Sequence, residues 1–553
     1  MANISKVYLL NTPLEDDMKN TLYFASASSQ QAYFNSVIGK TYTNVSYQSD
    51  TRTFRCPDQL DTVRQYNYMM YQNTAYCNKW FYCFIKKSVY VSDGYTDVQF
   101  EVDPLQTFMF DITVRPSFVE REHTNNDTIG ANTVPENLEL GDYINQPPDE
   151  PYVSGSGLVP STRINYLTGN TYVVIGTTTT KLDVAQPSPN YNGVFSGITY
   201  LTFPTYSDAN AYIYFLQTKV SEDPIVTVFM CPEKLIEGTT WATYEDGPHE
   251  FQYGFVEPSS APKVLNSVEI TKPTTIDGYS PRNNKVLSYP YQYLEINNNA
   301  GKSNIYQYEL FKGSGTSSST TCHFSTFGAI GTGCSIQCVP INYNKTSQNT
   351  WNFDFRNYEE AVEAPKLPTC AWNNDAFTNW LTQNAVTLGG NALVDAGKVA
   401  IGAGIVLGVA TGGVGLAVGG ALAIGGIAGV GDAVKQVYEH RLIPPTAKGN
   451  INQGDLLFSQ KRSFSIYKKC IRSEYAVIAD NFFDLFGYKT CKVKVPYTDH
   501  RQNWWYTKTI DANIIGNVPN EEMNKIKGAY NNGLTFWKNP ANFLNYSVSN
   551  GIV

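Results

Sequence analysis

The chain has 553 residues, too many for one hydrophobic core, and its length predicts roughly two to four domains. Hydrophobic residues make up 42%, which excludes wholesale disorder, whereas charged residues make up only 16% and aromatic residues replace many of them. The net charge of −8, with scattered basic residues, excludes a dedicated surface for duplex nucleic acid, although it allows DNA to pass through a neutral or acidic channel.

The first 125 residues carry the clearest β pattern. An aromatic and β-branched run at 80–91 and an alternating run at 98–102 flank a Ser-Asp-Gly turn, which predicts a hairpin. Asp103 and Pro104 then supply the N-cap and first residue of a short helix. No apolar stretch of signal-peptide length opens the chain, so we expect synthesis in a reducing cytosol with the cysteines reduced.

The middle of the chain alternates between irregular and regular segments. Residues 125–162 are acidic and proline-rich and predict a long excursion between domains. A helix is predicted over 208–220, capped by Ser207 or Asp208, and a buried strand over 225–230. Aromatic runs within 289–311 predict a second hairpin.

The pattern as a whole predicts a mainly β fold with α+β insertions. Glu474 to Phe486 has helical apolar spacing, and Gly487 is suited to end that helix. We predict five parts: an N-terminal β domain at 1–130, a mixed α/β insertion at 131–265, a second β domain at 266–370, an apolar loop with flanking helices at 371–450, and a C-terminal α/β domain at 451–553.

One segment, 399–431, has the composition of a membrane insert. Its 33 residues include 12 Gly, 7 Ala and 13 Val, Ile or Leu, with no charge and no aromatic ring. A single helix of this length would run about 50 Å, longer than the ~30 Å hydrocarbon layer, so a helical hairpin broken near Thr411 fits better. The repeated small-xxx-small spacing favours close helix packing in lipid, whereas the glycines weaken a helix in water.

Three interpretations of this segment remain open: a buried core helix or glycine-rich loop, a constitutive transmembrane anchor, and an insert that enters a membrane when triggered. We favour the third, because no polybasic flank accompanies the run and glycine dilutes its hydrophobicity. Asp395 and Asp432 bracket the run, and their protonation would ease transfer into lipid. The residues to which we assign membrane activity are Val399, Ile401, Gly404, Ile405, Leu407, Gly408, Gly412, Gly415, Leu416, Gly419, Leu422, Ile424, Gly425, Ile427 and Gly429.

Candidate catalytic and metal-binding clusters are weak. The stretch 118–123, which contains Glu120, Glu122 and His123, is better explained as a strand with an ion pair than as an acid–base site. Cys322, His323, Cys334 and Cys338 could supply four zinc ligands, but their spacing matches none of the common zinc motifs. We therefore expect no catalytic residues, no metal and no cofactor.

Several motifs resemble the tail knob (tail tip) protein of small short-tailed phages of Gram-positive bacteria. They are FNSV at 34–37, NKWFYCFI at 78–85, FEVDPLQTFMFDI at 100–112, SFVEREH at 117–123, YPY at 289–291, FGYK at 486–489, NNGLTFW at 531–537 and NYSVSN at 545–550. Together with the glycine-rich apolar segment they extend over nearly the whole chain in order, with the weakest match over 125–265.

The resemblance implies a hexameric tube of β-barrel-like domains at the distal end of the virion tail. Each subunit's hydrophobic loop, here 399–431, would fill the lumen and on triggering form a pore in the host membrane for DNA ejection. The implied partners are five further copies, other tail and collar proteins, host membrane lipids, and phage DNA in transit without sequence-specific binding. Two alternatives stay open: a cell-wall-degrading or glycan-binding tail protein, and a pore-forming toxin.

Overall fold

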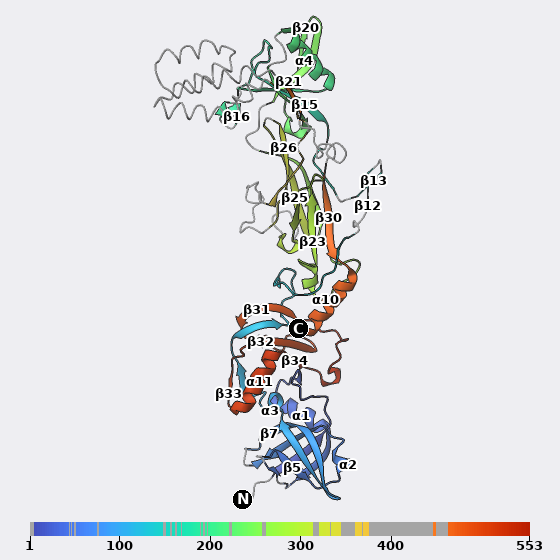
Figure 1. The fold of residues 1–553 in the computed structure, drawn as a ribbon, viewed down its shortest axis with the longest axis vertical. Coiled ribbons are helices and arrows are strands. Elements are labelled where there is room, and N and C mark those ends of the chain that lie inside the picture. The colour runs from blue at the N-terminus through green and yellow to red at the C-terminus, as the bar shows by residue number, and fades with distance from the viewer. Residues whose placement is uncertain are drawn as a thin grey trace, which may run out of the picture. The chain divides into compact units, whose positions relative to one another are not determined.

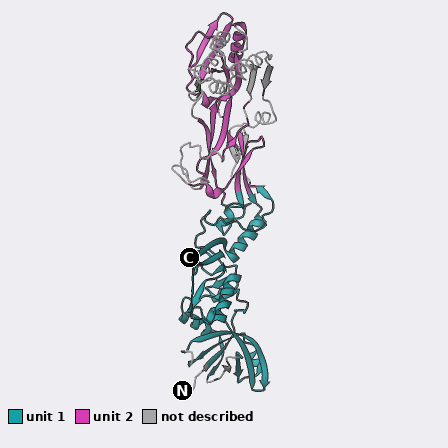
Figure 2. Cartoon of the chain, turned by 60° about the vertical axis from the view of Figure 1, so that its left-hand side comes forward, with its two compact units in different colours: residues 1–144, 274–292, 470–553 teal, residues 145–273, 293–469 magenta. Residues whose placement is uncertain are grey.

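The computed structural model describes residues 5–343, 360–374, 446–449 and 463–553 (Figure 1). Short breaks fall at 44, 46, 49–50, 75–76, 147–150, 155–156, 161–162, 168, 188–189, 192–193, 196, 220–223, 257–261, 313–319, 332, 366 and 368. The chain forms two compact units, each built from separate stretches of sequence (Figure 2). Unit 1 comprises 1–144, 274–292 and 470–553, and unit 2 comprises 145–273 and 293–469. The five predicted domain boundaries stay predictions.

Unit 1 begins with a seven-stranded sheet in the order β3-β1-β6-β7-β8-β5-β4. Its central hairpin joins β7 to β8 through Asp93-Gly94, with Ser92 paired to Tyr95, which confirms the first predicted hairpin. The strands are β1 (Ser5–Leu10), β3 (Ile38–Thr43), β4 (Tyr47–Gln48), β5 (Thr53–Cys56), β6 (Tyr68–Asn73), β7 (Trp80–Ser92) and β8 (Tyr95–Val102). The associated helices are α1 (Ala27–Ser36), α2 (Leu60–Val63) and α3 (Pro104–Thr107). Asp103 caps α3 as predicted, because its side chain accepts a hydrogen bond from Gln106 N.

A second sheet in unit 1 joins the two ends of the chain. Its order is β2-β34-β32-β10-β31, and β2 pairs in parallel with β34. The strands are β2 (Asn20–Leu22), β10 (Ser117–Glu122), β31 (Tyr488–Lys494), β32 (Trp504–Ile510) and β34 (Leu534–Trp537). Beside it lie the ribbon of β9 (Ile112–Val114) with β33 (Ile514–Gly516), and the helices α10 (Ser473–Phe486) and α11 (Asn520–Asn532). Gly487 ends α10 as predicted, whereas α11 was not predicted.

Unit 2 contains a seven-stranded sheet in the order β20-β21-β18-β15-β19-β28-β29. The strands are β15 (Thr171–Thr177), β18 (Thr199–Phe203), β19 (Ile225–Pro232), β20 (Ala242–Asp246), β21 (His249–Val256), β28 (Thr369–Asn374) and β29 (Thr446–Gly449). Helix α4 (Tyr206–Lys219) packs Tyr212, Phe215 and Leu216 against one face of the sheet. This helix confirms the prediction for 208–220 with one correction: Thr205, rather than Ser207 or Asp208, accepts the capping hydrogen bond, from Asp208 N at 3.1 Å.

The remaining strands of unit 2 enclose its largest core. One group contains β22 (Lys263–Thr271), β25 (Thr321–Ile330), β26 (Cys334–Pro340) and β27 (Val362–Glu363), and the other β14 (Arg163–Asn165), β30 (Ser463–Ile471), β23 (Gln292–Asn297) and β24 (Ser303–Tyr306). Buried side chains from both groups and from β15 and β19 form one continuous cluster. The pairing of β23 with β24 confirms the second predicted hairpin, with a shorter loop.

The short strands β11 (Tyr143–Asn145), β12 (Pro151–Ser154), β13 (Gly157–Pro160), β16 (Asn190–Tyr191) and β17 (Val194–Phe195) complete the described fold. Within the stretch 125–162, for which the sequence predicts a long excursion between domains, β12 pairs with β13 as a two-stranded ribbon. The fold is therefore mainly β, as predicted. Among the described residues, no helix has both the length and the apolar character needed to cross a membrane.

Candidate functional site: the strands that carry the apolar segment

The predicted membrane-active residues between Val399 and Gly429, their flanks Asp395 and Asp432, and the predicted flanking helices all lie outside the described residues. The structure does define the two strands on either side of the stretch 375–445, which contains this segment. Description stops at Asn374, the last residue of β28, and resumes at Thr446, the first residue of β29. β28 and β29 are therefore the described strands nearest to the apolar segment in sequence.

The two strands are antiparallel neighbours. Cys370 pairs with Gly449, and Asn374 pairs with Thr446 after a register shift. Cα atoms of directly paired residues in antiparallel strands are about 5 Å apart. Both ends of the 375–445 segment are therefore held side by side by backbone hydrogen bonds. Since the entropy of closing a loop grows only slowly with its length, such a junction tolerates a long insertion.

The strand pair is anchored through β19. Thr369 of β28 pairs with Phe229, and β19 in turn pairs with β15 along most of its length. Phe229 is buried in the large core of unit 2, and Ile175 of β15 is buried in the core beneath α4. The sheet therefore has a packed core on each face close to the point where β28 attaches. β29, by contrast, is the last strand of the sheet and pairs only with β28 among the described strands.

The charged stretch 118–123 is structural, as predicted. Glu120 pairs with Lys508 of β32 at 2.9 Å, and Glu122 pairs with Lys494 of β31. Arg121 pairs with Glu136 and donates from Nη1 to the carbonyl oxygen of Gly487 at 2.7 Å. These contacts fix β10 against its neighbours, and they occupy the carboxylates that a catalytic role would need.

His123 is held in one neutral form. Its Nδ1 accepts a hydrogen bond from Tyr506 N at 2.8 Å, so its Nε2 carries the proton and donates to the carbonyl oxygen of Asp484 at 3.1 Å. Burial, reinforced by nearby Arg501, keeps the pKa of His123 well below its usual value. An imidazole with both nitrogens occupied and its protonated form disfavoured is a structural element rather than an acid–base group.

The Cys-His cluster lies in β25 and β26. Cys322, Cys334 and Cys338 are buried, and burial raises the pKa of the Cys322 thiol to about 12. Among the described residues, no group of three or more His, Cys, Asp or Glu side chains is placed to hold a metal ion.

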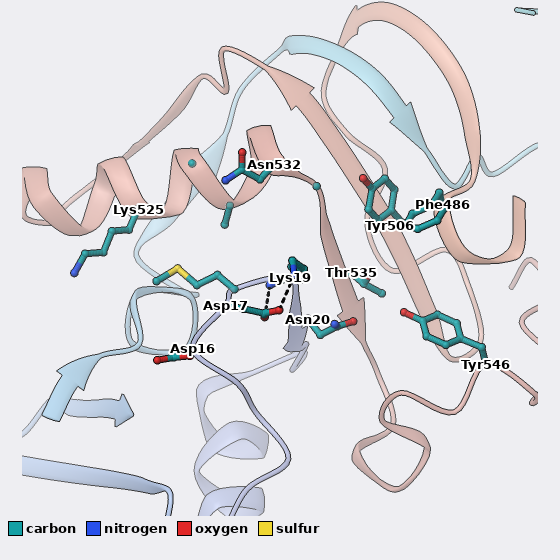
Figure 3. A pocket seen from close by; sticks show the side chains of 14 residues that line it. Asp16, Asp17, Lys19, Asn20, Phe486, Tyr506, Lys525, Asn532, Thr535 and Tyr546 are labelled. Carbon is teal, nitrogen blue, oxygen red and sulfur yellow. Dashed lines mark hydrogen bonds and ion pairs between the residues drawn. The ribbon is translucent and has the colours of Figure 1, made fainter. Parts of the chain in front are cut away.

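A cavity of about 570 Å³ in unit 1 lies between the segment 16–20, α11 and β32 (Figure 3). Its charged groups are satisfied by the protein itself. Asp16 pairs with Lys86, Asp17 with Lys19 at 3.2 Å, and Lys525 with Glu101 at 2.9 Å. The hydrogen bond from Lys525 lowers the pKa of Glu101, which keeps this carboxylate ionised and paired. The cavity thus contains balanced ion pairs rather than an uncompensated charge.

Sequence comparisons identify the chain's relatives. Residues 258–551 match the family model described as Bacillus phage phi29, tail knob protein gp9, C-terminal domain, and residues 4–113 match the N-terminus of the caudoviral major tail protein. The chain is 27% identical to the tail knob protein gp9 of Bacillus phage B103, over 95% of each chain. It is 26% identical to gp9 of Bacillus phage phi29, over 98% of this chain and 97% of the relative.

A solved structure has the same fold. The solved structure of the bacteriophage C1 tail knob protein, gp12, superposes with a TM-score of 0.57 over 99% of this chain and 100% of that one. At 14% identity, this likeness establishes a shared fold only. The family model covers more than half of the sequence, and the alignments with the two tail knob relatives cover 95% and 97% of those relatives. The chain therefore belongs to the phi29 gp9 family of phage tail knob proteins, components of the distal end of the virion tail.

Proposed function

We propose that this tail knob protein forms a hexameric tube at the tail tip and that 399–431 is its membrane-active loop. Six copies of the loop fill the lumen of the tube before infection. On triggering they leave it, insert into the host membrane and form a pore through which DNA is ejected. Neighbouring tail and collar proteins complete the conduit, and membrane lipids are the target of the loop.

Composition supports this role for the loop. Its 33 uncharged residues are hydrophobic enough to enter lipid, yet 12 glycines make an independent helix in water costly, at about 1 kcal/mol each relative to alanine. Such a segment gains order from an apolar enclosure or a bilayer. In lipid, the glycines at 404, 408 and 412 would let two helices pack closely.

The observation that carries the proposal is the pairing of Asn374 with Thr446. Because the two ends of the segment are held together at the edge of a packed sheet, the chain between them can change its environment without unfolding unit 2. The position of a buried core helix, by contrast, is fixed by the side-chain contacts along the helix itself. A loop with clamped ends is suited to a switch between two surroundings.

The conduit needs no strong affinity for DNA. The chain has a net charge of −8, and its basic residues are scattered along the sequence. A tube of such subunits repels a polyanion, so DNA would pass through it without binding. We also propose that the protein has no catalytic activity. Cleavage of peptidoglycan or capsule by the purified protein would contradict this part.

Deletion of the loop gives the main test. We expect a variant with 399–431 replaced by a short Gly-Ser linker to assemble as the parent does, because the paired strands remain. Leakage of a dye from phospholipid vesicles should be lost. Assembly is checked by light scattering and negative-stain imaging, and a truncated ring that releases dye as fast as the parent would refute the membrane role.

Point substitutions separate insertion from assembly. Leu407→Lys together with Ile424→Lys places two charges in the loop, each costing about 2.5–3.5 kcal/mol at the centre of a membrane helix. We expect the leakage rate to fall at least about tenfold. Val493→Lys is the matched control, since Val493 lies in β31 and is 71% exposed, and it should leak like the parent. If the leakage rate falls equally in the double variant and in Val493→Lys, the effect comes from added positive charge anywhere on the protein and not from the loop.

A further inference from the structure

His123 connects three elements of unit 1. It follows the last residue of β10, and its backbone N donates to the carbonyl oxygen of Tyr506 in β32 at 3.1 Å. Its ring Nδ1 accepts from Tyr506 N at 2.8 Å, and its Nε2 donates to the carbonyl oxygen of Asp484 in α10 at 3.1 Å. Trp504 Nε1 donates to the same Asp484 oxygen at 3.0 Å. We call this meeting point of β10, β32 and α10 the His123 junction.

The His123 junction accepts only the neutral form of the imidazole. Nδ1 accepts through its lone pair, so a proton added there would place one N–H against the N–H of Tyr506. His123 is 2% exposed, so solvent cannot supply a new acceptor to Tyr506 N. Protonation therefore requires the ring to move away from Tyr506. The move leaves a buried backbone donor without a partner, which is costly.

Positive charge next to the junction adds to this cost. The buried guanidinium of Arg501 donates from Nη2 to the carbonyl oxygen of Thr124, the residue after His123, at 3.0 Å. His500 is half-buried, and its ring lies 5.6 Å from that of Tyr497, centroid to centroid. Burial and the charge of Arg501 lower the pKa of both histidines, that of His500 to about 4 from 6.5. Two imidazolium ions beside this guanidinium would repel it and each other.

Other titratable and charged groups surround the two histidines and Arg501. The basic ones are Arg121 of β10 and Lys494 of β31, the acidic ones are Glu122 of β10, Asp127 and Asp484 of α10, and the phenol is that of Tyr488. Burial raises the pKa of the three carboxyl groups, so their proton uptake at low pH favours the folded state. Their effect is opposite to that of the histidines. A comparison of the parent with histidine variants separates the two, because the carboxyl groups are present in both.

We infer that the His123 junction is an acid-sensitive joint of unit 1: protonation of His123, assisted by that of His500, separates α10 from the ends of β10 and β32. A histidine whose pKa is lower in the folded state contributes stability that is present above about pH 6.5 and is lost as the pH falls. At pH 5 one such histidine raises the equilibrium constant for local opening about 30-fold over its value at pH 7.5. This response belongs to unit 1 and does not require the apolar loop or its flanking aspartates.

Hydrogen exchange of the full-length protein, followed by mass spectrometry, tests the inference. The peptide that covers β32, residues 504–510, gives the opening constant once its rates are corrected for the intrinsic pH dependence of exchange. In His123→Asn the amide oxygen can still accept from Tyr506 N, but the side chain does not titrate. We expect the ratio of the parent's opening constant to that of His123→Asn to rise at least about tenfold from pH 7.5 to pH 5. For His500→Gln the ratio should rise at least about threefold, less because His500 is only half-buried.

His249→Asn is the matched control, because His249 is also buried but lies in β21 of unit 2. The ratio of the parent's opening constant to that of this variant should stay within about twofold over the same pH range. The inference is wrong if the ratio for His123→Asn rises less than about threefold, or if it rises equally for His249→Asn. If His123→Asn does not fold, His500→Gln decides alone, and a constant ratio overturns the inference. Vesicle leakage is not part of the measurement, so failure here would leave the proposed membrane role of the loop unaffected.

Discussion

Gly487 joins the end of α10 to the second sheet of unit 1 in a conformation that only glycine adopts readily. Its φ is 63° and its ψ is −154°. A Cβ added there would lie 2.2 Å from both the carbonyl carbon and oxygen of Glu122, and 2.3 Å from His123 N. All three are backbone atoms at the end of β10, so no side-chain rotation can relieve the contact. We therefore predict that Gly487→Ala strongly destabilises unit 1.

The magnitude has two parts. A non-glycine residue in this region of φ and ψ costs about 1–3 kcal/mol. Overpacking against fixed backbone adds about 1–3 kcal/mol. If the end of β10 moves away from residue 487 to relieve the contact, the hydrogen bond from Arg121 to the carbonyl oxygen of residue 487 is also weakened. A loss of roughly 2–6 kcal/mol is a large fraction of the ~5–15 kcal/mol that stabilises a typical domain.

Urea unfolding followed by tryptophan fluorescence measures the effect. Trp504, Trp505 and Trp537 are almost fully buried in unit 1, so they report on the region affected. Gly528→Ala is the control: a Cβ at Gly528 meets nothing within 4 Å, and this helical position should gain about 0.5–1 kcal/mol from alanine. If Gly487→Ala lowers the unfolding free energy by less than about 1 kcal/mol, the close approach of Gly487 to β10 is wrong.

Three further predictions concern charge and thiols. First, the double variant Asp395→Asn with Asp432→Asn should raise vesicle leakage at about pH 7.5 toward the level that the parent shows at about pH 5, because neutral flanks enter lipid more easily. If the parent leaks equally at both pH values, protonation of these two residues does not trigger insertion. Second, burial raises the pKa of Asp103 to about 6 from 3.8, so the folded state binds a proton more tightly than the unfolded state. This contribution is present below about pH 4 and is lost as pH rises through about 6, and it amounts to ~3 kcal/mol. In Asp103→Asn the fall in unfolding free energy between those pH values should shrink by most of that amount; an unchanged pH profile would count against it. Third, exposed Cys77 should react with a thiol reagent at pH 8 much faster than buried Cys322, whose pKa is raised to about 12 by burial; peptide mapping that finds equal labelling would contradict the burial.

Short-range features of the fold could be predicted from the sequence because the causes lie within a few residues. Asp93-Gly94 selects a tight hairpin turn, Asp103 and Pro104 start α3, and the positive φ of Gly487 ends α10. The composition of 399–431 likewise needs no neighbours to be recognised. For this segment the sequence remains the sole source, since its residues lie outside those that the structure describes.

Other features depend on contacts between residues far apart in the chain. Asn20 pairs with Thr535 in the parallel β2–β34 ladder, and Phe229 pairs with Thr369 where β28 joins the sheet of unit 2. The sequence around one residue of such a pair does not indicate which residue lies opposite it. The choice of strand partner depends on which faces are buried against each other and on the connections between the strands. The exposure of Tyr206 and Tyr214 was decided in the same way, by the face of α4 that packs against the sheet.

The sequence by itself thus determined the local turns, the helix ends and the hydrophobic character of one segment, since these follow from the chemistry of adjacent residues. Only the tertiary structure decided that Asn374 and Thr446, on either side of the stretch that contains this segment, lie on neighbouring strands, and that two tyrosines of α4 face solvent. Both outcomes follow from the packing of distant residues, which no single stretch of the chain encodes.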